Sequence, residues 1–199
     1  MNTTTAATGP DFGLREAVHS EVHAWGAVRI VPLRPEEDIE LVHGWVREER
    51  ARFWGMLDHS REQVLEIYQF LDSLDTHHAF LALLDEQPVA LFQTYQPLHD
   101  PVSEAYPARA EDAGMHLLLA PPTQPVPHFT PRLVSVLLRY MFADPAIDRV
   151  IVEPDARNDK AIRRLRTTCF ELGPKIQLAE KEAQLAFLTR DRFENAPTV

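Results

Sequence analysis

Gly114-Met115-His116-Leu117-Leu118-Leu119-Ala120 is the stretch of sequence that best defines the fold. An apolar run of this length predicts a largely buried β-strand, and Pro121-Pro122 ends it because proline lacks the N–H group that a sheet requires. Thr130-Pro131 then supplies a helix cap and a proline suited to the first helical position. The predicted helix carries one apolar face, formed by Leu133, Val136, Leu137, Tyr140 and Met141. The stretch therefore predicts a buried strand followed by a long helix that packs on a sheet.

Upstream of this strand, the pattern predicts a strand, two helices and a β-hairpin. Residues 28–34 alternate as a strand does, and Pro35 opens a helix that extends to about Arg50. Ser60-Arg61-Glu62-Gln63 is a capping box, which predicts the start of a second helix. The apolar runs 78–84 and 89–95 flank Asp85-Glu86-Gln87-Pro88, and this arrangement predicts the hairpin.

Downstream, residues 149–153 predict a further apolar strand, and Asn158 starts an Arg-rich helix that extends to about Cys169. Two more strands follow near residues 175–178 and 184–189. The two-residue and 3.6-residue periods thus alternate along the chain, which is typical of an α/β or mixed α+β domain. We expect one domain at residues 27–193, with a flexible arm at 1–26 and a flexible tail at 194–199, because the two ends show no sustained period.

Composition narrows the classes of function. The chain has 199 residues, of which 30 are Asp or Glu and 20 are Lys or Arg, so its formal net charge is −10. This sign argues against a protein that coats nucleic acid or anionic membranes, and it favours a small-molecule or protein partner. The single cysteine, Cys169, excludes an internal disulfide and a multi-thiolate metal site. No apolar run reaches the ~20 residues of a membrane span and no secretory signal is recognisable, so we expect a cytoplasmic protein.

The order and spacing of the predicted elements resemble the GCN5-related N-acetyltransferase (GNAT) superfamily over residues 27–193. The resemblance implies a GNAT fold, in which helices, about four here, flank a mixed central sheet and acyl-CoA enters where two neighbouring parallel strands separate. Three segments carry a narrower likeness: Arg52-Phe53-Trp54-Gly55-Met56, Asp112-Ala113-Gly114-Met115-His116-Leu117-Leu118-Leu119 and Val152-Glu153-Pro154-Asp155-Ala156-Arg157-Asn158-Asp159-Lys160-Ala161. They resemble the hallmarks of the siderophore N-acyltransferases, which include enzymes of the aerobactin, desferrioxamine and mycobactin pathways.

By this resemblance, His116 and Asp155 form the catalytic pair. The residues themselves leave alternatives open. His116 shares a strand face with Leu118, where a histidine can be a core residue bonded to a carbonyl group, although histidine is also the side chain best suited to accept a proton near neutral pH. Asp155 follows an apolar strand at its carboxyl end, where α/β sheets place their ligands, but aspartate after proline is also a common turn former.

The resemblance implies acyl-CoA-dependent acylation of an N-hydroxylated diamine or lysine, such as N-hydroxycadaverine or N6-hydroxylysine, in siderophore biosynthesis. The hydroxylamine nitrogen would attack the thioester of acetyl-CoA or succinyl-CoA to give a hydroxamate, by direct transfer in a ternary complex and without a metal. Such a role implies a functional link to an amine N-hydroxylase and a siderophore synthetase. Two alternatives remain: a GNAT acetyltransferase for another amine (a polyamine, an antibiotic or a protein), and a catalytically silent acyl-CoA-binding module.

The extended arm of acyl-CoA can bond to backbone groups of one short segment, Leu118, Leu119 and Ala120. A glycine-rich turn is expected before the long helix to hold the pyrophosphate, but prolines that lack an amide proton occupy that region. Five side chains are candidates to replace it or to add cofactor contacts: His128, Thr130, Arg132, Asn158 and Lys160. The last two could equally just begin an exposed helix.

Four residues are candidates for the acceptor side of the cleft: Trp54, Met56, Gln93 and Tyr95. Together they offer an apolar channel for methylene groups and a polar end for the hydroxylamine. The simpler interpretation of Trp54 is that it fills the core, whereas a buried glutamine requires a polar partner. Alternation places Gln93 and Tyr95 on one face of their strand.

Overall fold

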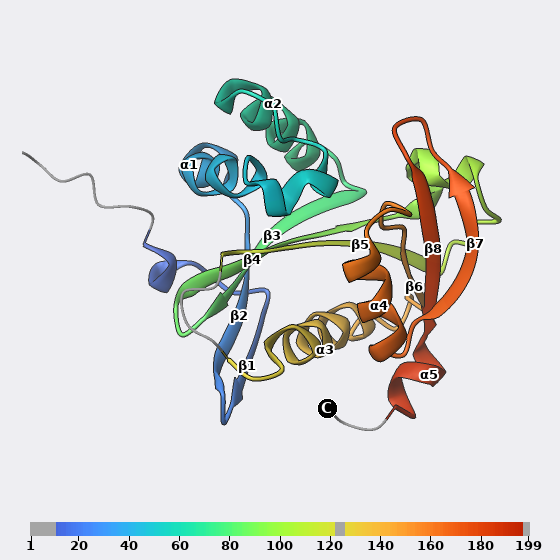
Figure 1. The fold of residues 1–199 in the computed structure, drawn as a ribbon. Helices are drawn as coiled ribbons and strands as arrows, with labels where there is room; N and C mark the ends of the chain where they lie inside the picture. The colour runs from blue at the N-terminus through green and yellow to red at the C-terminus, as the bar shows by residue number, and fades with distance from the viewer. Residues whose placement is uncertain (1–10, 122–125, 197–199) are drawn as a thin grey trace, which may run out of the picture.

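The computed structural model describes residues 11–121 and 126–196, which form an eight-stranded sheet with helices on both faces (Figure 1). The strands are β1 (His19–His23), β2 (Gly26–Pro32), β3 (His77–Leu84), β4 (Gln87–Tyr95), β5 (Asp112–Leu119), β6 (Arg149–Val152), β7 (Glu171–Gln177) and β8 (Glu182–Thr189). Their order in the sheet is β1-β2-β3-β4-β5-β6-β8-β7, and only the β5–β6 pair is parallel within the described chain.

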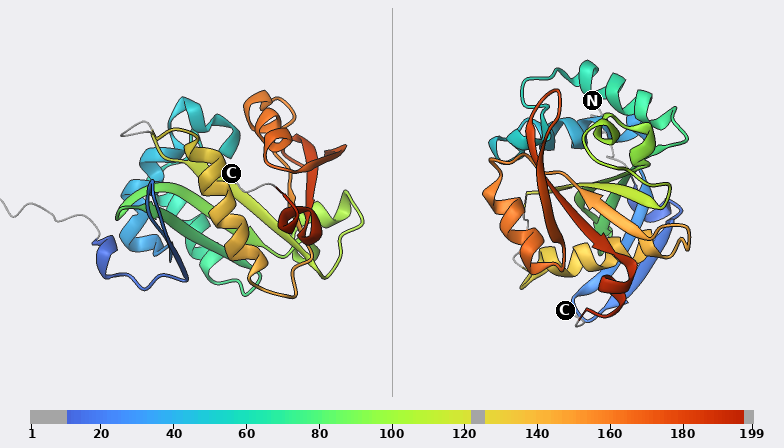
Figure 2. Two further views of the ribbon diagram at one scale, coloured as in Figure 1. Left: turned by 90° about the horizontal axis from the view of Figure 1, so that it is seen from below. Right: turned by 90° about the vertical axis from the view of Figure 1, so that its right-hand side faces the viewer.

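The helices divide between the two faces of the sheet (Figures 1 and 2). Helices α1 (Pro35–Val46) and α2 (Arg61–Asp72) cover one face and pack on an apolar cluster that includes Val31, Leu81 and Leu91. Helix α3 (Phe129–Phe142) crosses the opposite face and packs on a second cluster. Helices α4 (Asp159–Thr167) and α5 (Arg190–Glu194) lie beside the C-terminal strands. Because strand side chains alternate between faces, β3, β4 and β5 each contribute to both clusters.

The central strands β5 and β6 separate soon after they meet. They pair only from Asp112 to Gly114 on β5 and from Arg149 to Ile151 on β6. Beyond that point β5 continues beside β4 as far as Leu119, whereas β6 continues beside β8. A gap therefore opens in the middle of the sheet, which is the feature that the GNAT resemblance implies.

Most predicted elements are confirmed, including the β3–β4 hairpin, strand β5 and the Ser60–Gln63 capping box, whose two reciprocal hydrogen bonds are both present. Two helix boundaries were wrong. Helix α1 ends at Val46 instead of about Arg50, and the chain continues as the 3₁₀-helix η2 (Glu49–Trp54). Helix α3 begins at Phe129 with His128 as its N-cap, so the predicted cap, Thr130, lies buried within the first turn.

The segment predicted as a flexible arm, residues 1–26, contains structure that its sequence does not indicate. Residues 19–23 form the edge strand β1, which pairs with β2, and a short 3₁₀-helix, η1 (Phe12–Leu14), precedes it. Arg15 is buried and forms a bidentate ion pair with Asp38 at distances of 2.6 and 2.7 Å. Residues 11–26 are therefore tied to the domain by a buried ion pair and a strand ladder. None of the helices in residues 11–121 and 126–196 has the length and apolar character needed to cross a membrane.

Gly114, at the end of the parallel pairing, makes room for the ring of Tyr95. A Cβ atom at position 114 would lie 2.0 Å from Cζ of Tyr95, far inside van der Waals contact. We expect Gly114→Ala to lower the free energy of unfolding by about 2 kcal/mol, because Tyr95 is buried and cannot move without repacking. Denaturant unfolding monitored by fluorescence would measure the change.

Gly44→Ala is the matched control, because nothing lies within 4 Å of a Cβ at that position on the exposed side of α1. Alanine is the better helix former, so this variant should gain up to about 1 kcal/mol. Equal stability of the two variants would contradict the packing of Tyr95 on Gly114.

Candidate active site

His116 and Glu153 face each other across the gap between β5 and β6. Gly114 and Ile151 are the last parallel partners, and each site residue lies two positions further along its strand direction. The alternation of side chains therefore places both on the face that α1 and α2 cover. Nε2 of His116 forms a hydrogen bond with Oε1 of Glu153. The glutamate is buried at 4% exposure, whereas the imidazole keeps 37% exposure.

Two further groups hold the buried carboxylate of Glu153. The hydroxyl group of Tyr95 donates to Oε2 at 2.8 Å, and Nζ of Lys181 lies 3.9 Å from Oε1. Burial and the adjacent Glu153 carboxylate raise the pKa of Tyr95 well above its ordinary value, so the phenol remains a donor. The burial of one carboxylate is thus compensated by a phenol, an imidazole and an ammonium group.

The pKa of His116 is raised above its ordinary value. Burial opposes the charged imidazolium, but the charge of Glu153 and its hydrogen bond outweigh burial. Conversely, burial raises the pKa of Glu153, but the pairing with His116 outweighs it and the pKa is lowered. The two ring nitrogens of His116 face two acceptors, Glu153 Oε1 and Gln93 Oε1, the second at 3.4 Å. This arrangement suits an imidazolium, which donates from both nitrogens.

A polar network connects His116 to the helices that cover it. Gln93, the cross-strand partner of His116, donates from Nε2 to the hydroxyl oxygen of Tyr68 on α2 at 3.3 Å. The indole N–H of Trp54 donates to the same oxygen at 3.3 Å. The Trp54 ring also packs edge-on against His116, with centroids 6.3 Å apart. The structure therefore brings three of the four predicted acceptor residues, Trp54, Gln93 and Tyr95, into contact with the histidine or its partner.

A cavity of about 490 Å³ opens beside this network. His116, Gln93 and Tyr95 line it together with residues of α2, β3 and the loop after β4. Its other lining residues are Phe70, Leu71, Leu74, Thr76, His77, His78, Thr94, His99, Asp100 and Pro101. The fourth acceptor candidate, Met56, does not line this cavity and packs in the cluster beneath α1 and α2.

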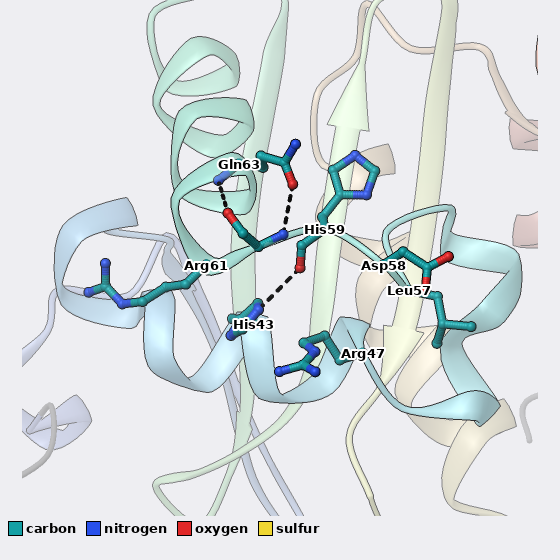
Figure 3. A pocket seen from close by; sticks show the side chains of 8 residues that line it. His43, Arg47, Leu57, Asp58, His59, Arg61 and Gln63 are labelled. Carbon is teal, nitrogen blue, oxygen red and sulfur yellow. Dashed lines mark hydrogen bonds between the residues drawn. The ribbon is translucent and has the colours of Figure 1, made fainter.

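A second cavity, of about 450 Å³, lies between α1 and the start of α2 (Figure 3). His43 of α1 and Arg47, the C-cap residue of that helix, line it opposite the segment from Leu57 to Gln63. The ring of His43 bonds to the carbonyl oxygen of His59 at 3.3 Å, and the dashed lines beside it show the capping box. This cavity contains none of the predicted site residues.

Asp155 is placed differently from His116. Its carboxylate accepts hydrogen bonds from the backbone N–H group and the guanidinium of Arg157, at 2.7 to 2.9 Å. These bonds form a turn, and Arg157 lowers the pKa of the carboxylate. Among the described residues, Glu153 and not Asp155 is the carboxylate bonded to His116. Glu153 and Tyr68 are site residues that the sequence did not predict; the available signal was that each is a polar residue within an otherwise apolar face.

The backbone candidates for cofactor contact lie further along the strand that carries His116, at the end of β5 and just beyond it. Leu118 is buried, and the amide of Ala120 donates to the carbonyl oxygen of Val89 on β4. Strand alternation therefore directs the backbone groups of Leu119 away from β4, and its carbonyl oxygen accepts a hydrogen bond from Arg50.

The remaining candidates lie at the starts of α3 and α4. His128 is exposed, with φ = 55°, Thr130 is buried and Arg132 is partly exposed. Asn158 caps α4 by accepting from the amide of Ala161, and Lys160 is exposed. Two prolines of the predicted phosphate-binding segment, Pro122 and Pro125, lie outside the described residues. Within the described ranges, no group of three or more His, Cys, Asp or Glu side chains is arranged to hold a metal ion.

Comparison with known proteins gives the family. Residues 34–178 match the family described as the acetyltransferase (GNAT) domain. The chain belongs to the GNAT acetyltransferase family. This confirms the predicted fold and the acyltransferase class of the family.

The GNAT chain is similar to two curated relatives with low identity. It is 22% identical over 162 residues to the N(6)-hydroxylysine O-acetyltransferase of Escherichia coli, covering 80% of this chain and 51% of the relative. It is 23% identical over 158 residues to the N-hydroxyputrescine acetyltransferase of Acinetobacter baumannii, covering 79% of this chain and 75% of the relative. The chain thus spans about half the length of the first curated relatives that it matches.

Solved structures share the GNAT fold. The aminoglycoside acetyltransferase AAC(6′)-Ib, solved with paromomycin and acetyl-CoA, superimposes with a TM-score of 0.75 at 22% identity. The match covers 86% of this chain and 98% of the other. At this identity the likeness supports the fold alone.

The pairing of His116 with Glu153 can be measured without any substrate. In an NMR titration, we expect the imidazole of His116 to titrate above the ordinary value of about 6.5, because the carboxylate stabilises its charged form. In Glu153→Gln, His116 remains partly buried but loses the negative charge that stabilises its imidazolium form. The midpoint of the His116 titration should therefore fall by about one pH unit or more. Glu104→Gln, at an exposed carboxylate, should leave the midpoint unchanged. Identical midpoints in all three proteins would contradict the ion pair.

Proposed function

We propose that this GNAT acyltransferase transfers the acyl group of acetyl-CoA or succinyl-CoA to the nitrogen of an N-hydroxylated diamine or lysine, forming a hydroxamate for siderophore biosynthesis. The observation that carries the proposal is the His116–Glu153 pair, which lies at the opening between β5 and β6 beside a cavity whose wall is partly apolar. Two relatives are named for acetylation of N6-hydroxylysine and N-hydroxyputrescine, and these names support an N-hydroxylated amine as the acceptor.

In the proposed reaction, the hydroxylamine nitrogen attacks the thioester carbonyl carbon. A C–N bond forms, the C–S bond breaks, and the nitrogen loses one proton. The neutral form of His116 accepts this proton, directly or through a water molecule, and Glu153 stabilises the imidazolium that results. The proton then passes to the departing sulfur, so the products are a hydroxamate and CoA thiol.

Acyl-CoA would bind in the gap between β5 and β6. β5 has no strand partner on this side beyond Gly114, so the backbone groups of Leu117 and the N–H group of Leu119, which alternation directs away from β4, can bond to the amides of the pantetheine arm. Lys160 and His128 are exposed and could reach the phosphates, with Arg132 close by in sequence. The side-chain oxygen of Asn158 is already used as a helix cap, which supports a structural role for that residue.

For proton transfer, the geometry supports Glu153 over Asp155 as the partner of His116. We assign Asp155 to positioning, because its turn connects β6 to α4 and its backbone bridges to Ala183 on β8. Cys169 adopts φ = 65° and packs against the apolar cluster under α3, which supports direct transfer without an acyl-enzyme. The hydroxylated acceptor would be supplied by an amine N-hydroxylase, and the hydroxamate would be consumed by a siderophore synthetase.

The choice of acceptor tests the proposal. Thiol release from acetyl-CoA or succinyl-CoA should be at least about tenfold faster, in kcat/KM, with N-hydroxycadaverine or N6-hydroxylysine than with cadaverine or lysine. The N–OH group makes the nitrogen nucleophilic at neutral pH, whereas an alkylamine is almost wholly protonated there. A preference for the unhydroxylated amines would instead favour the second candidate, an acetyltransferase for simple amines. CoA binding without turnover of any acceptor would favour the silent module.

Substitutions at the site test the roles of its residues. His116→Ala should lower kcat by about 100-fold or more, because it removes the proton acceptor. Glu153→Gln should move the acid limb of the pH–rate profile to lower pH, because the pKa of His116 falls and its neutral form persists at lower pH.

Cys169→Ala should keep normal turnover, because the proposed reaction has no acyl-enzyme. If Asp155→Asn lost as much activity as Glu153→Gln while remaining folded, the assignment of Asp155 to positioning would be wrong.

A further inference from the structure

The cavity beside His116 contains a carboxylate that the proposed chemistry does not use. Asp100, in the loop after β4, lines the same cavity as His116. Two aromatic rings lie between His116 and Asp100. The ring of His116 packs on that of Tyr95 with centroids 5.0 Å apart, and the ring of Tyr95 stacks on that of His77 with centroids 5.8 Å apart. Nε2 of His77 in turn lies 3.4 Å from Oδ2 of Asp100. Asp100 therefore marks a part of the cavity about two aromatic rings away from the reacting centre.

Local structure holds the Asp100 carboxylate in place. Oδ1 accepts the backbone N–H of Val102 at 2.9 Å, which caps the 3₁₀-helix η4 (Pro101–Glu104). No lysine or arginine of the described ranges forms an ion pair with Asp100, and its side chain is 27% exposed. A carboxylate has about four acceptor positions, so this one can accept further hydrogen bonds after those from Val102 and His77.

Apart from its histidines, the only charged side chain among the described residues that line this cavity is negative. Asp100 is its only acidic lining residue, and no lysine or arginine of the described chain lines it. The other groups that can titrate there are four histidines and a tyrosine: His77, His78, His99, His116 and Tyr95. The apolar part of the wall is formed by Phe70, Leu71, Leu74 and Pro101. Phe70 is 63% exposed, which is unusual for a large apolar side chain and offers a surface for methylene groups.

We propose that Asp100 binds the distal ammonium group of the acceptor, so that the protein selects a cationic diamine derivative over an amino acid. This inference rests on the proposed function and decides between its two acceptors. An alkyl chain along Phe70 and Leu74 would place the hydroxylamine at His116 and the ammonium group at Asp100. The α-carboxylate of N6-hydroxylysine would have no permanent cation to pair with and would lie near a second carboxylate.

Acceptors that differ only in the distal group provide the test. Steady-state CoA release should be measured with N-hydroxycadaverine, with N-pentylhydroxylamine, which lacks the ammonium group, and with N6-hydroxylysine, which adds a carboxylate. We expect the wild type to prefer N-hydroxycadaverine to both of the others by about tenfold or more in kcat/KM. In Asp100→Asn, the preference over N-pentylhydroxylamine should fall about tenfold, mainly through KM. Asparagine keeps an oxygen for the N–H of Val102, so η4 remains capped.

Glu104→Gln is the control for the change in net charge, since Glu104 is exposed on η4 and does not line the cavity. It should keep the wild-type preference. The inference is overturned if Asp100→Asn keeps the preference, or if it weakens both acceptors equally. Failure of the proposed function gives a different result: the wild type would acylate cadaverine and not N-hydroxycadaverine. In that case Asp100 would be tested by comparing cadaverine with pentylamine, which lacks the distal ammonium group. A wild type that acylates none of these acceptors overturns both proposals.

Discussion

The separation of β5 from β6 after three residue pairs is the constraint on which the site depends. Up to Gly114 and Ile151 the two strands satisfy each other's backbone groups, and beyond them each strand has a different neighbour. The backbone groups of β5 that face the gap have no strand partner, and such groups are well suited to bind an extended ligand. The same separation leaves room for the side chains of His116 and Glu153 to meet between the strands.

The burial of Glu153 explains why a polar cluster exists within an apolar sheet. An isolated buried carboxylate would be strongly destabilising, so its neighbours must supply charge or hydrogen bonds. His116, Tyr95 and Lys181 do so from three different strands or loops. The packing of Tyr95 over Gly114 places its hydroxyl group where the carboxylate needs a donor. Stability and the protonation of the histidine are therefore coupled through one buried group.

Net charge acts locally in this protein. The proposed cofactor is a polyanion and the chain has a formal charge of −10, but the exposed Lys160 lies in the first turn of α4, the helix that follows β6. The cavity beside His116 has the opposite charge, because Asp100 is its only Asp, Glu, Lys or Arg lining residue among the described residues. Since charges in water are screened beyond about 10 Å at ordinary salt, two substrates of opposite charge can be bound side by side.

The sequence by itself determined the order of most strands and helices, the capping box at Ser60, the N-cap at Asn158, and the strand that carries His116. Those signals depend on contacts between residues two to four positions apart, which a single sequence displays directly. Only the tertiary structure decided that residues 19–23 pair with β2, and that Glu153 rather than Asp155 meets His116. His116 and Glu153 are 37 residues apart, and their contact is set by the register of a parallel strand pair. A shift of one residue would turn either side chain to the opposite face, and no local pattern specifies that register.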